Sequence, residues 1–141
     1  MTQKEITKIV NEYYPLICSD YNSTALVEFH YNIYERLSGE KGMTGEVHAH
    51  AEYDWNKDKI YIYTSRMKCE EDIVRSLIHE CVHSTQSKEM FDFWYENGYT
   101  YKTHPFEIYA RKAEENWKEY VFAEFDRWYH EMGEKNGYTE Y

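Results

Sequence analysis

Two histidines and a glutamate lie within five residues, in the segment His79-Glu80-Cys81-Val82-His83. On a helix, positions i and i+4 lie on one face about one turn apart, so both imidazoles can reach a single metal ion. Glu80 lies too far round the helix to bind that ion easily, but its carboxylate can take a proton from a water molecule held by the metal. The spacing, H-E-x-x-H, therefore supplies two ligands and a general base. The alternative is a solvated helix face that matches the motif by chance.

The residues around this motif predict the helix that it requires. The segment at about 70–88 has apolar side chains at spacings of three and four residues, as in a buried helical stripe. These side chains are Ile73, Val74, Leu77, Ile78, Cys81 and Val82. Acidic residues 70–72 fall in the first turn, where carboxylates interact favourably with the helix dipole. His79 and His83 lie beside the stripe, so the pattern favours metal ligands at the border between the core and a cleft.

A third ligand must come from elsewhere in the chain, because a catalytic zinc ion takes three protein ligands and a water molecule. The candidates are His104, Glu107, Glu114 and the pair His48 and His50. We favour Glu107, which begins a second helix that can pack against the motif helix. The alternative role for Glu107 is helix capping, because Pro105 at the first helical position makes Glu107 the third. Both roles need the same carboxylate, so the residues alone leave the third ligand open.

The segment HECVH followed by HPFEIYARKAEE resembles the small zincin metallopeptidases of the gluzincin type, many of which come from phages and mobile elements. In that family a helical glutamate in an E-x-x-A context supplies the third ligand, and residues 107–110 match this context. The resemblance covers roughly residues 46–115. It implies one Zn²⁺ per chain, bound by His79, His83 and Glu107.

One position departs from the gluzincin pattern. Many members carry an acidic residue four positions after the ligand glutamate, where it holds a motif histidine, whereas this chain has Arg111. Gln86 or Glu114 is therefore the candidate for orienting a histidine. A second resemblance stays open, to the SprT-like proteases, whose third ligand is a histidine after the motif helix. His104 can take that part, although those proteins usually act on or near DNA and the acidic charge of this chain fits that poorly.

The gluzincin resemblance implies a zinc-dependent metalloendopeptidase that hydrolyses a protein or peptide substrate. Zinc would activate a water molecule, and Glu80 would act as the general base and later protonate the leaving amine. The candidates for stabilising the transition state are Tyr99, Tyr101, His104 and Tyr109. One edge of a predicted hairpin can pair with an extended peptide. Two other classes stay open: a non-proteolytic zinc amidase, and a catalytically inactive zinc-binding interaction protein.

Length, charge and cysteine content indicate the number of domains, the partners and the location of the protein. The 141 residues predict a single domain over 1–141, which the resemblance implies is zincin-like, without indicating an oligomeric state. The net charge of -10 argues against a nucleic-acid partner, which requires clustered lysine and arginine. With no run of about 20 apolar residues and no signal-peptide pattern, neither a membrane span nor secretion is predicted. Three cysteines without C-x-x-C spacing favour reduced thiols in the cytoplasm, or in the host cytoplasm for a phage protein.

The expected fold class is α+β, a mostly helical minimal zincin-like domain with a small antiparallel sheet packed on the motif helix. The expected elements are a helix at 2–15, a helix at 23–39, a hairpin at about 46–65, the motif helix at about 70–88, a short strand at 99–102 and a long C-terminal helix at about 105–132. Thr2 and Glu5 form a T-x-x-E capping box for the first helix, which Pro15 should end. His48 and His50 fall on the polar face of the hairpin, which is most often a solvent face.

Overall fold

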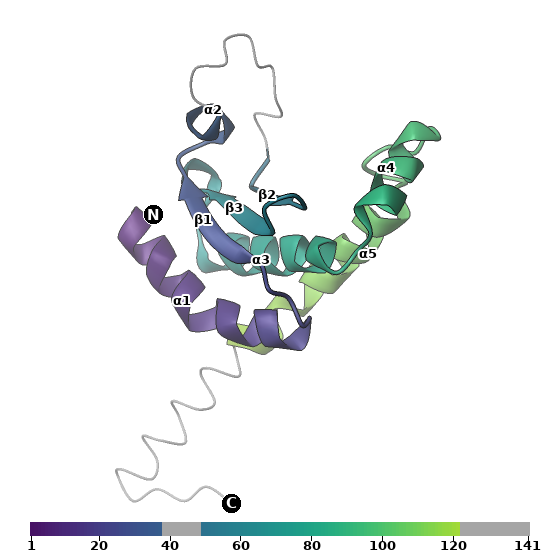
Figure 1. Ribbon diagram of the computed structural model, residues 1–141. Coiled ribbons are helices and arrows are strands. Elements are labelled where there is room, and N and C mark those ends of the chain that lie inside the picture. Colours follow the sequence, from purple (N-terminus) through teal and green to yellow (C-terminus); the bar gives the residue numbers. More distant parts are fainter. Residues whose placement is uncertain (38–48, 122–141) are drawn as a thin grey trace, which may run out of the picture.

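The computed structural model describes residues 1–37 and 49–121, which form an α+β architecture with five α-helices and one three-stranded mixed sheet. In chain order the elements are α1 (Gln3–Asp20), β1 (Leu26–His30), α2 (Ile33–Arg36), β2 (Ala51–Asp54), β3 (Lys59–Tyr63), α3 (Glu70–Ser84), α4 (Lys88–Glu96) and α5 (Pro105–Ala113), with 3₁₀ turns at Thr64–Arg66 and Glu114–Asn116. The sheet lies against α3, and α1 and α5 pack along the same helix (Figure 1). The helix that carries the motif is therefore the centre of the fold.

Helix α1 begins with the predicted capping box, in which the Thr2 side chain accepts a hydrogen bond from the Glu5 amide. It does not end at Pro15, as expected, but continues to Asp20. A proline inside a helix costs about 3 kcal/mol, because one hydrogen bond is lost and the ring crowds the preceding turn. Ile17, in the turn after the proline, is completely buried. Packing of this last turn against the core therefore holds the helix together beyond Pro15.

The segment after α1 is a strand followed by a short helix, so the helix expected at 23–39 is wrong. β1 pairs in parallel with β3, and Val27 and Phe29 lie opposite Ile60 and Ile62. The apolar residues of this segment fit a helical spacing, but alternate residues are apolar too, as in a strand. The strand forms because β3 offers a hydrogen-bonding partner for its backbone. The local pattern does not reveal this partner. The sheet is consequently mixed rather than antiparallel.

β2 and β3 form the predicted antiparallel hairpin. Within the sheet the order is β1-β3-β2, so β3 is central and β2 is an edge. Ile60 and Ile62 of β3 belong to the main core, while Tyr61 and Tyr63 are buried in a separate cluster with Ile33. Residues 46–48, including His48, belong to the expected hairpin but lie outside the described residues.

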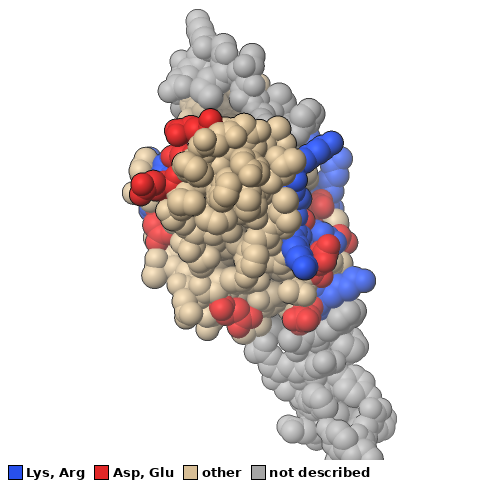
Figure 2. Space-filling view, turned by 90° about the vertical axis from the view of Figure 1, so that its right-hand side faces the viewer, with Lys and Arg blue, Asp and Glu red and all other residues tan. Residues whose placement is uncertain are grey.

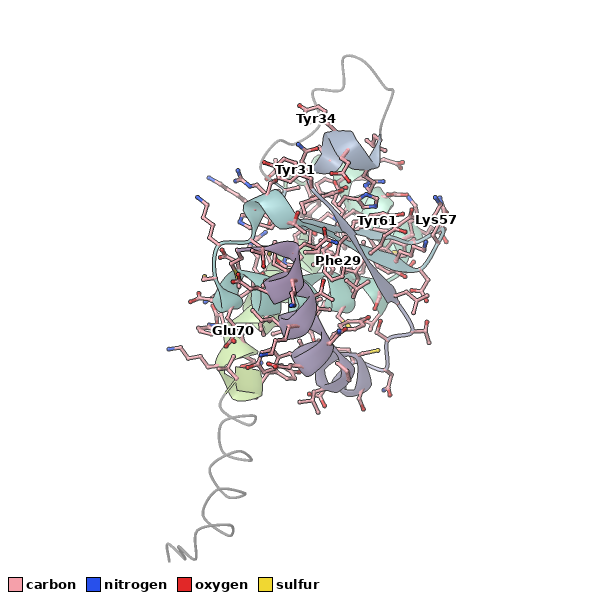
Figure 3. All side chains as sticks on the ribbon, turned by 90° about the vertical axis from the view of Figure 1, so that its left-hand side faces the viewer. Phe29, Tyr31, Tyr34, Lys57, Tyr61 and Glu70 are labelled. Carbon is pink, nitrogen blue, oxygen red and sulfur yellow. The ribbon has the colours of Figure 1, made fainter. Side chains whose placement is uncertain are left out.

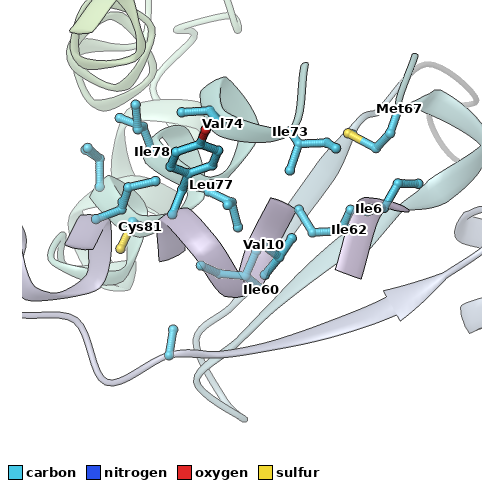
Figure 4. Close-up of a cluster of buried hydrophobic side chains, with 14 of the residues drawn as sticks. Ile6, Val10, Ile60, Ile62, Met67, Ile73, Val74, Leu77, Ile78 and Cys81 are labelled. Atoms are coloured by element: carbon cyan, nitrogen blue, oxygen red, sulfur yellow. The ribbon is translucent and has the colours of Figure 1, made fainter. Parts of the chain in front are cut away.

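The main core joins α1, β3 and α3. Its buried side chains include Ile6, Val10, Ile60, Ile62, Ile73, Val74, Leu77, Ile78 and Cys81 (Figure 4). The apolar stripe predicted for the motif helix is thus confirmed, and Cys81 is the small core residue expected of it. α3 ends at Ser84 rather than at residue 88. Because one side of α3 is packed so closely, the histidines at the border of the stripe have fixed positions.

Helix α4 follows α3 almost directly. It begins after Ser87, whose side chain accepts a hydrogen bond from the Met90 amide. It ends just before Gly98, whose φ of +89° lies in the region that glycine adopts without strain. No strand forms at the described residues 99–102; residues 101–103 form a turn instead. The aromatic residues of this segment, Tyr99 and Tyr101, lie between α4 and α5.

Helix α5 packs on α3 and is much shorter than the helix expected at 105–132. It ends at Ala113, where a 3₁₀ turn follows, and helical structure resumes at 117–121. Residues 122–132 of the expected helix lie outside the described residues. None of the helices in the described part of the chain is long and apolar enough to cross a membrane.

Candidate metal centre

The two motif histidines and the glutamate between them form one buried group on α3. The ligand atoms of His79, Glu80 and His83 all lie within 4.8 Å of one another. All three residues are buried, on the side of α3 that borders the apolar stripe. This group fits an H-E-x-x-H motif and can hold a metal ion.

Helix α5 brings a further carboxylate to this group. Oε1 of Glu107 lies 2.5 Å from Nε2 of His83, and Oε2 lies 3.8 Å from Nε2 of His79. Glu107 is buried as well, because α5 packs directly on α3. Two imidazole nitrogens and a carboxylate oxygen are a donor set typical of catalytic zinc sites. The fold therefore brings together the three residues that the family resemblance implied as ligands.

His104 caps α5, so Glu107 is not needed as the cap. Nδ1 of His104 accepts a hydrogen bond from the Phe106 amide at 3.0 Å. Nε2 of the same ring donates to the carbonyl oxygen of Phe91 at 2.9 Å. His104 is completely buried, and both ring nitrogens are used within the protein. The side chain thus joins the start of α5 to α4 and leaves neither nitrogen for a metal ion.

Each motif histidine has a second partner that fixes its ring. Nδ1 of His79 lies 2.9 Å from Oε2 of Glu114, and Nδ1 of His83 lies 2.7 Å from Oε1 of Gln86. Both oxygens accept a hydrogen bond from Nδ1–H, so in each neutral ring Nδ1 carries the proton and the Nε2 lone pair faces the site. Gln86 and Glu114, the two candidates for orienting a histidine, therefore each contact one.

Arg75 belongs to the surroundings of the site although the sequence analysis did not identify it. It bridges two carboxylates, with Nε 2.8 Å from Glu71 and Nη1 3.3 Å from Glu114. The guanidinium therefore holds Glu114 against His79. The only signal in the sequence is its position four residues before His79, which places both side chains on one face of the helix.

Trp55, in the turn after β2, is a second residue that the sequence analysis did not identify. Its ring centre lies 5.9 Å from that of His83 and 4.8 Å from that of Phe91. Its Nε1 donates a hydrogen bond to the carbonyl oxygen of Gln86 at 3.0 Å. Trp55 therefore packs beside one motif histidine and also fixes the residue that orients it. A tryptophan in a turn matches no motif, so only the fold reveals this role.

A cleft of about 1110 Å³ opens onto the buried group. β2 with the following turn, α3, α4 and α5 all contribute side chains to it, including Glu80 and Glu107. Its aromatic lining consists of Tyr53, Trp55, Tyr61, Phe91, Tyr95 and Tyr101. The candidate metal ligands thus lie where an edge strand and two helices meet around an open space. This space gives a bound molecule access to Glu80 as well as to the metal site.

The side chains that the sequence suggested for stabilising a transition state differ in whether they line the cleft. Tyr101 lines the cleft, whereas Tyr99 and Tyr109 do not. Tyr109 is 61% exposed on the outer side of α5. Of the histidine pair expected on the hairpin, His50 lines the cleft but is exposed, and His48 lies outside the described residues.

The environment of the site shifts the pKa values of its titratable groups. Burial raises the pKa of Glu80 to about 7, although the two motif histidines lower it. Burial lowers the pKa of His79, but hydrogen bonds to Glu107 and Glu114 outweigh it and hold the pKa well above its usual range. Burial raises the pKa of Glu107, but the hydrogen bonds from His79 and His83 outweigh it and hold the pKa well below its usual range. The site therefore stabilises positive charge beside Glu107, as a metal cation requires.

No protein-family model matches the chain, and no curated protein or solved structure is significantly similar to it. The likeness to zincins consequently rests on the H-E-x-x-H motif and on the side chains that the fold gathers around it. The geometry of the site carries the functional inference.

Proposed function

We propose that this chain is a zinc-dependent metalloendopeptidase. The observation that carries the proposal is the position of Glu80, a buried carboxylate with a raised pKa that borders both the His79, His83 and Glu107 group and the cleft. A structural metal site is closed by its ligands and has no use for a general base beside an open space. An enzyme that activates water requires a metal site with both a general base and an open space beside it.

The residues present fit zinc better than calcium or magnesium. His79 and His83 offer nitrogen and Glu107 offers oxygen, and three such ligands leave a coordination position for water. Calcium and magnesium favour sites made of oxygen ligands alone. When bound, Zn²⁺ would lower the pKa of a water molecule and polarise the carbonyl group of a substrate.

The chain itself supplies the proton transfers and the orientation of the ligands. Glu80, whose carboxylate borders the cleft, accepts a proton from the attacking water and later passes it to the leaving amine. Glu114 and Gln86 hold the Nδ1–H groups of the two histidines, so each Nε2 stays directed at the metal position. Loss of either partner would let one ring rotate away from that direction.

Tyr101 is the residue that we propose for stabilising the oxyanion, because it lines the cleft and can donate its phenolic hydrogen. Arg111 fixes this part of the chain through hydrogen bonds to the carbonyl oxygens of Tyr101 and Lys102, at 2.7 and 3.1 Å. The same guanidinium lies 4.6 Å from the centre of the Tyr101 ring. A donor that is held in place before the reaction stabilises developing charge without reorganisation.

Edge strand β2 supports a peptide as the substrate. Among the described residues β2 pairs only with β3, and all of Ala51–Asp54 lines the cleft. An extended peptide can add to such an edge through backbone hydrogen bonds, which orient the scissile bond without requiring a particular side chain. We therefore propose protein segments in an extended conformation as the substrate class.

Zinc quantification and cleavage of casein test this proposal together. We expect one zinc per chain in the purified protein and time-dependent fragments from casein that a chelator abolishes. The double substitution His79→Ala and His83→Ala should lose both the zinc and the cleavage. Zinc binding with no cleavage of casein or of a peptide library, but with release of ammonia or amine from small amides, would instead assign the site to an amidase. Protein that takes up no zinc would contradict the proposal altogether.

A further inference from the structure

Apolar side chains gather on an exposed surface beside the cleft. We call it the aromatic surface; it comprises Met90, Phe93, Tyr95, Tyr101, Ile108 and Tyr109, from α4, α5 and the turn between them. Figure 2, which views the molecule from the side of α4 and α5, shows a broad face without charged side chains at its centre and with charged groups along its edges. Single exposed apolar residues are ordinary, but a contiguous group of them marks an interaction site.

Much of this surface belongs to helix α4, which contributes nothing to the hydrophobic core. It contributes no buried residue, although its nine residues include methionine and four aromatic side chains. The hydrogen bond from His104 to the Phe91 carbonyl fixes α4, and the rings of Phe91 and Tyr95 lie 4.7 and 4.5 Å from the His104 ring. The surface is therefore rigid, and a partner can bind it without the entropy cost of ordering a loop.

The aromatic surface and the cleft share two residues. Tyr95 and Tyr101 belong to both, since each lines the cleft and each is also exposed on the outer face. A polypeptide that leaves the cleft on the side of α4 and α5 meets this surface next. Its apolar side chains can bury themselves there, where aromatic rings offer a large contact area.

We propose that the aromatic surface is an exosite that binds apolar side chains of the polypeptide substrate outside the cleft. This inference rests on the proposed peptidase function and adds a preference for substrates that expose apolar segments. A second copy of the chain fits less well, because a partner on Tyr95 and Tyr101 would cover the entrance to the cleft. An anionic membrane fits less well, because Glu89 and Glu96 are exposed on α4 and the chain carries a net charge of -10.

The double substitution Phe93→Ser and Tyr109→Ser tests the exosite, since both side chains lie on the surface but outside the cleft. The first measurement uses Glu80→Gln protein and fluorescein-labelled casein, and follows binding by fluorescence anisotropy, so it requires no cleavage. Loss of two aromatic contacts should raise the Kd about tenfold. With active protein, the ratio of kcat/KM for casein to that for a short peptide confined to the cleft should fall by about the same factor.

The matched control is Leu26→Ser and Tyr31→Ser. These side chains are as exposed as Phe93 and Tyr109 but belong to the β1 side of the molecule, which faces the viewer in Figure 3. The control should leave the Kd unchanged, and circular dichroism should show that all variants are folded. A single Met90→Ser variant provides a second probe of the surface if the double variant does not fold.

Three results would overturn the exosite. The first is an equal Kd for casein in the surface and control variants. The second is a wild-type dimer in light scattering that the surface variant converts to a monomer, which would make the surface a contact between copies. The third is binding to anionic phosphatidylserine vesicles that is lost in the surface variant. Absence of cleavage by the wild type and all variants would contradict the peptidase function. The binding measurement with Glu80→Gln protein would still test the exosite.

Discussion

Oε2 of Glu114 lies 2.9 Å from Nδ1 of His79, while Oε2 of Glu107, seven residues earlier in the chain, lies 3.8 Å from Nε2 of the same ring. The two glutamates are separated by two helical turns, so both carboxylates project from one side of the helical segment toward α3. Arg75 bonds to Glu114 from α3 and completes the contact. One helical segment thus supplies both a proposed metal ligand and the group that orients another ligand.

Glu114→Ala should weaken zinc binding by about 10- to 100-fold, because the His79 ring loses the acceptor that fixes its orientation. The matched control is Glu115→Ala, which removes an exposed carboxylate one residue away and should leave the zinc affinity unchanged. Competition with a chromophoric chelator measures both affinities. Equal affinities in the two variants would show that Glu114 does not orient a ligand.

Glu107 and His104 should respond in opposite ways when each is replaced by alanine. Glu107→Ala removes a proposed ligand, so the zinc affinity should fall by several orders of magnitude. His104→Ala should leave the affinity nearly intact but lower the free energy of unfolding by about 2–4 kcal/mol, because the cap of α5, the bond to the Phe91 carbonyl and buried ring contacts are lost. Zinc titration and urea denaturation separate the two effects.

The reverse pattern would change the assignment. If zinc binding were lost in His104→Ala and kept in Glu107→Ala, the third ligand would be the histidine, as in SprT-like proteases. The present geometry argues against that arrangement, since both ring nitrogens of His104 already have partners within the protein. Glu107 would then be a buried carboxylate that serves only to pair with the motif histidines.

The motif helix was predictable from the sequence because its information is local. The spacing of His79, Glu80 and His83 fixes their relative positions once the helix forms, and the apolar stripe shows that it does form. The approach of Glu107 depends on how α5 packs against α3, which the residues alone left open. Trp55 and its contact with His83 depend on a turn that is distant in sequence, so no local pattern could place it.

The fold around the motif was less predictable, for two physical reasons. The segment that became β1 satisfies both a helical and an alternating pattern, and only pairing with β3 distinguishes them. Pro15 is a sound local signal for the end of a helix, but burial of Ile17 outweighs it. In both cases tertiary contacts override a local preference that is worth only a few kcal/mol.

Removal of zinc should lower the thermal stability without unfolding the protein at room temperature. Binding only to the folded state contributes about 4 kcal/mol when the free zinc concentration is a thousand times the Kd. The main core of α1, β3 and α3 contains none of the proposed ligands, so it should persist without the metal. Circular dichroism with and without a chelator measures the fall in Tm. Loss of the helical signal at 25 °C after chelation would mean that the metal holds the fold together.

Glu80→Gln should retain zinc and the fold but lose at least two orders of magnitude in kcat, because the amide has the shape of the carboxylate without its basicity. A suitable comparison is Glu52→Gln, which also lies in the cleft but pairs with Arg36 rather than with the metal group. That variant should keep most of its activity. Activity of Glu80→Gln within a few-fold of the wild type would exclude Glu80 as the base, and loss of zinc would make it a ligand.

Tyr101→Phe should lower kcat by about 10²- to 10³-fold with little change in KM, as expected when a donor to the oxyanion is removed. The hydroxyl group is protonated at neutral pH: burial raises the pKa of Tyr101 and the charge of Glu107 raises it further, although Arg111 lowers it. Tyr109→Phe is the matched control, because it removes the same hydroxyl group from a tyrosine outside the cleft. A fall in KM and kcat together, or equal effects of the two substitutions, would mean that Tyr101 only lines the cleft and that another group stabilises the transition state.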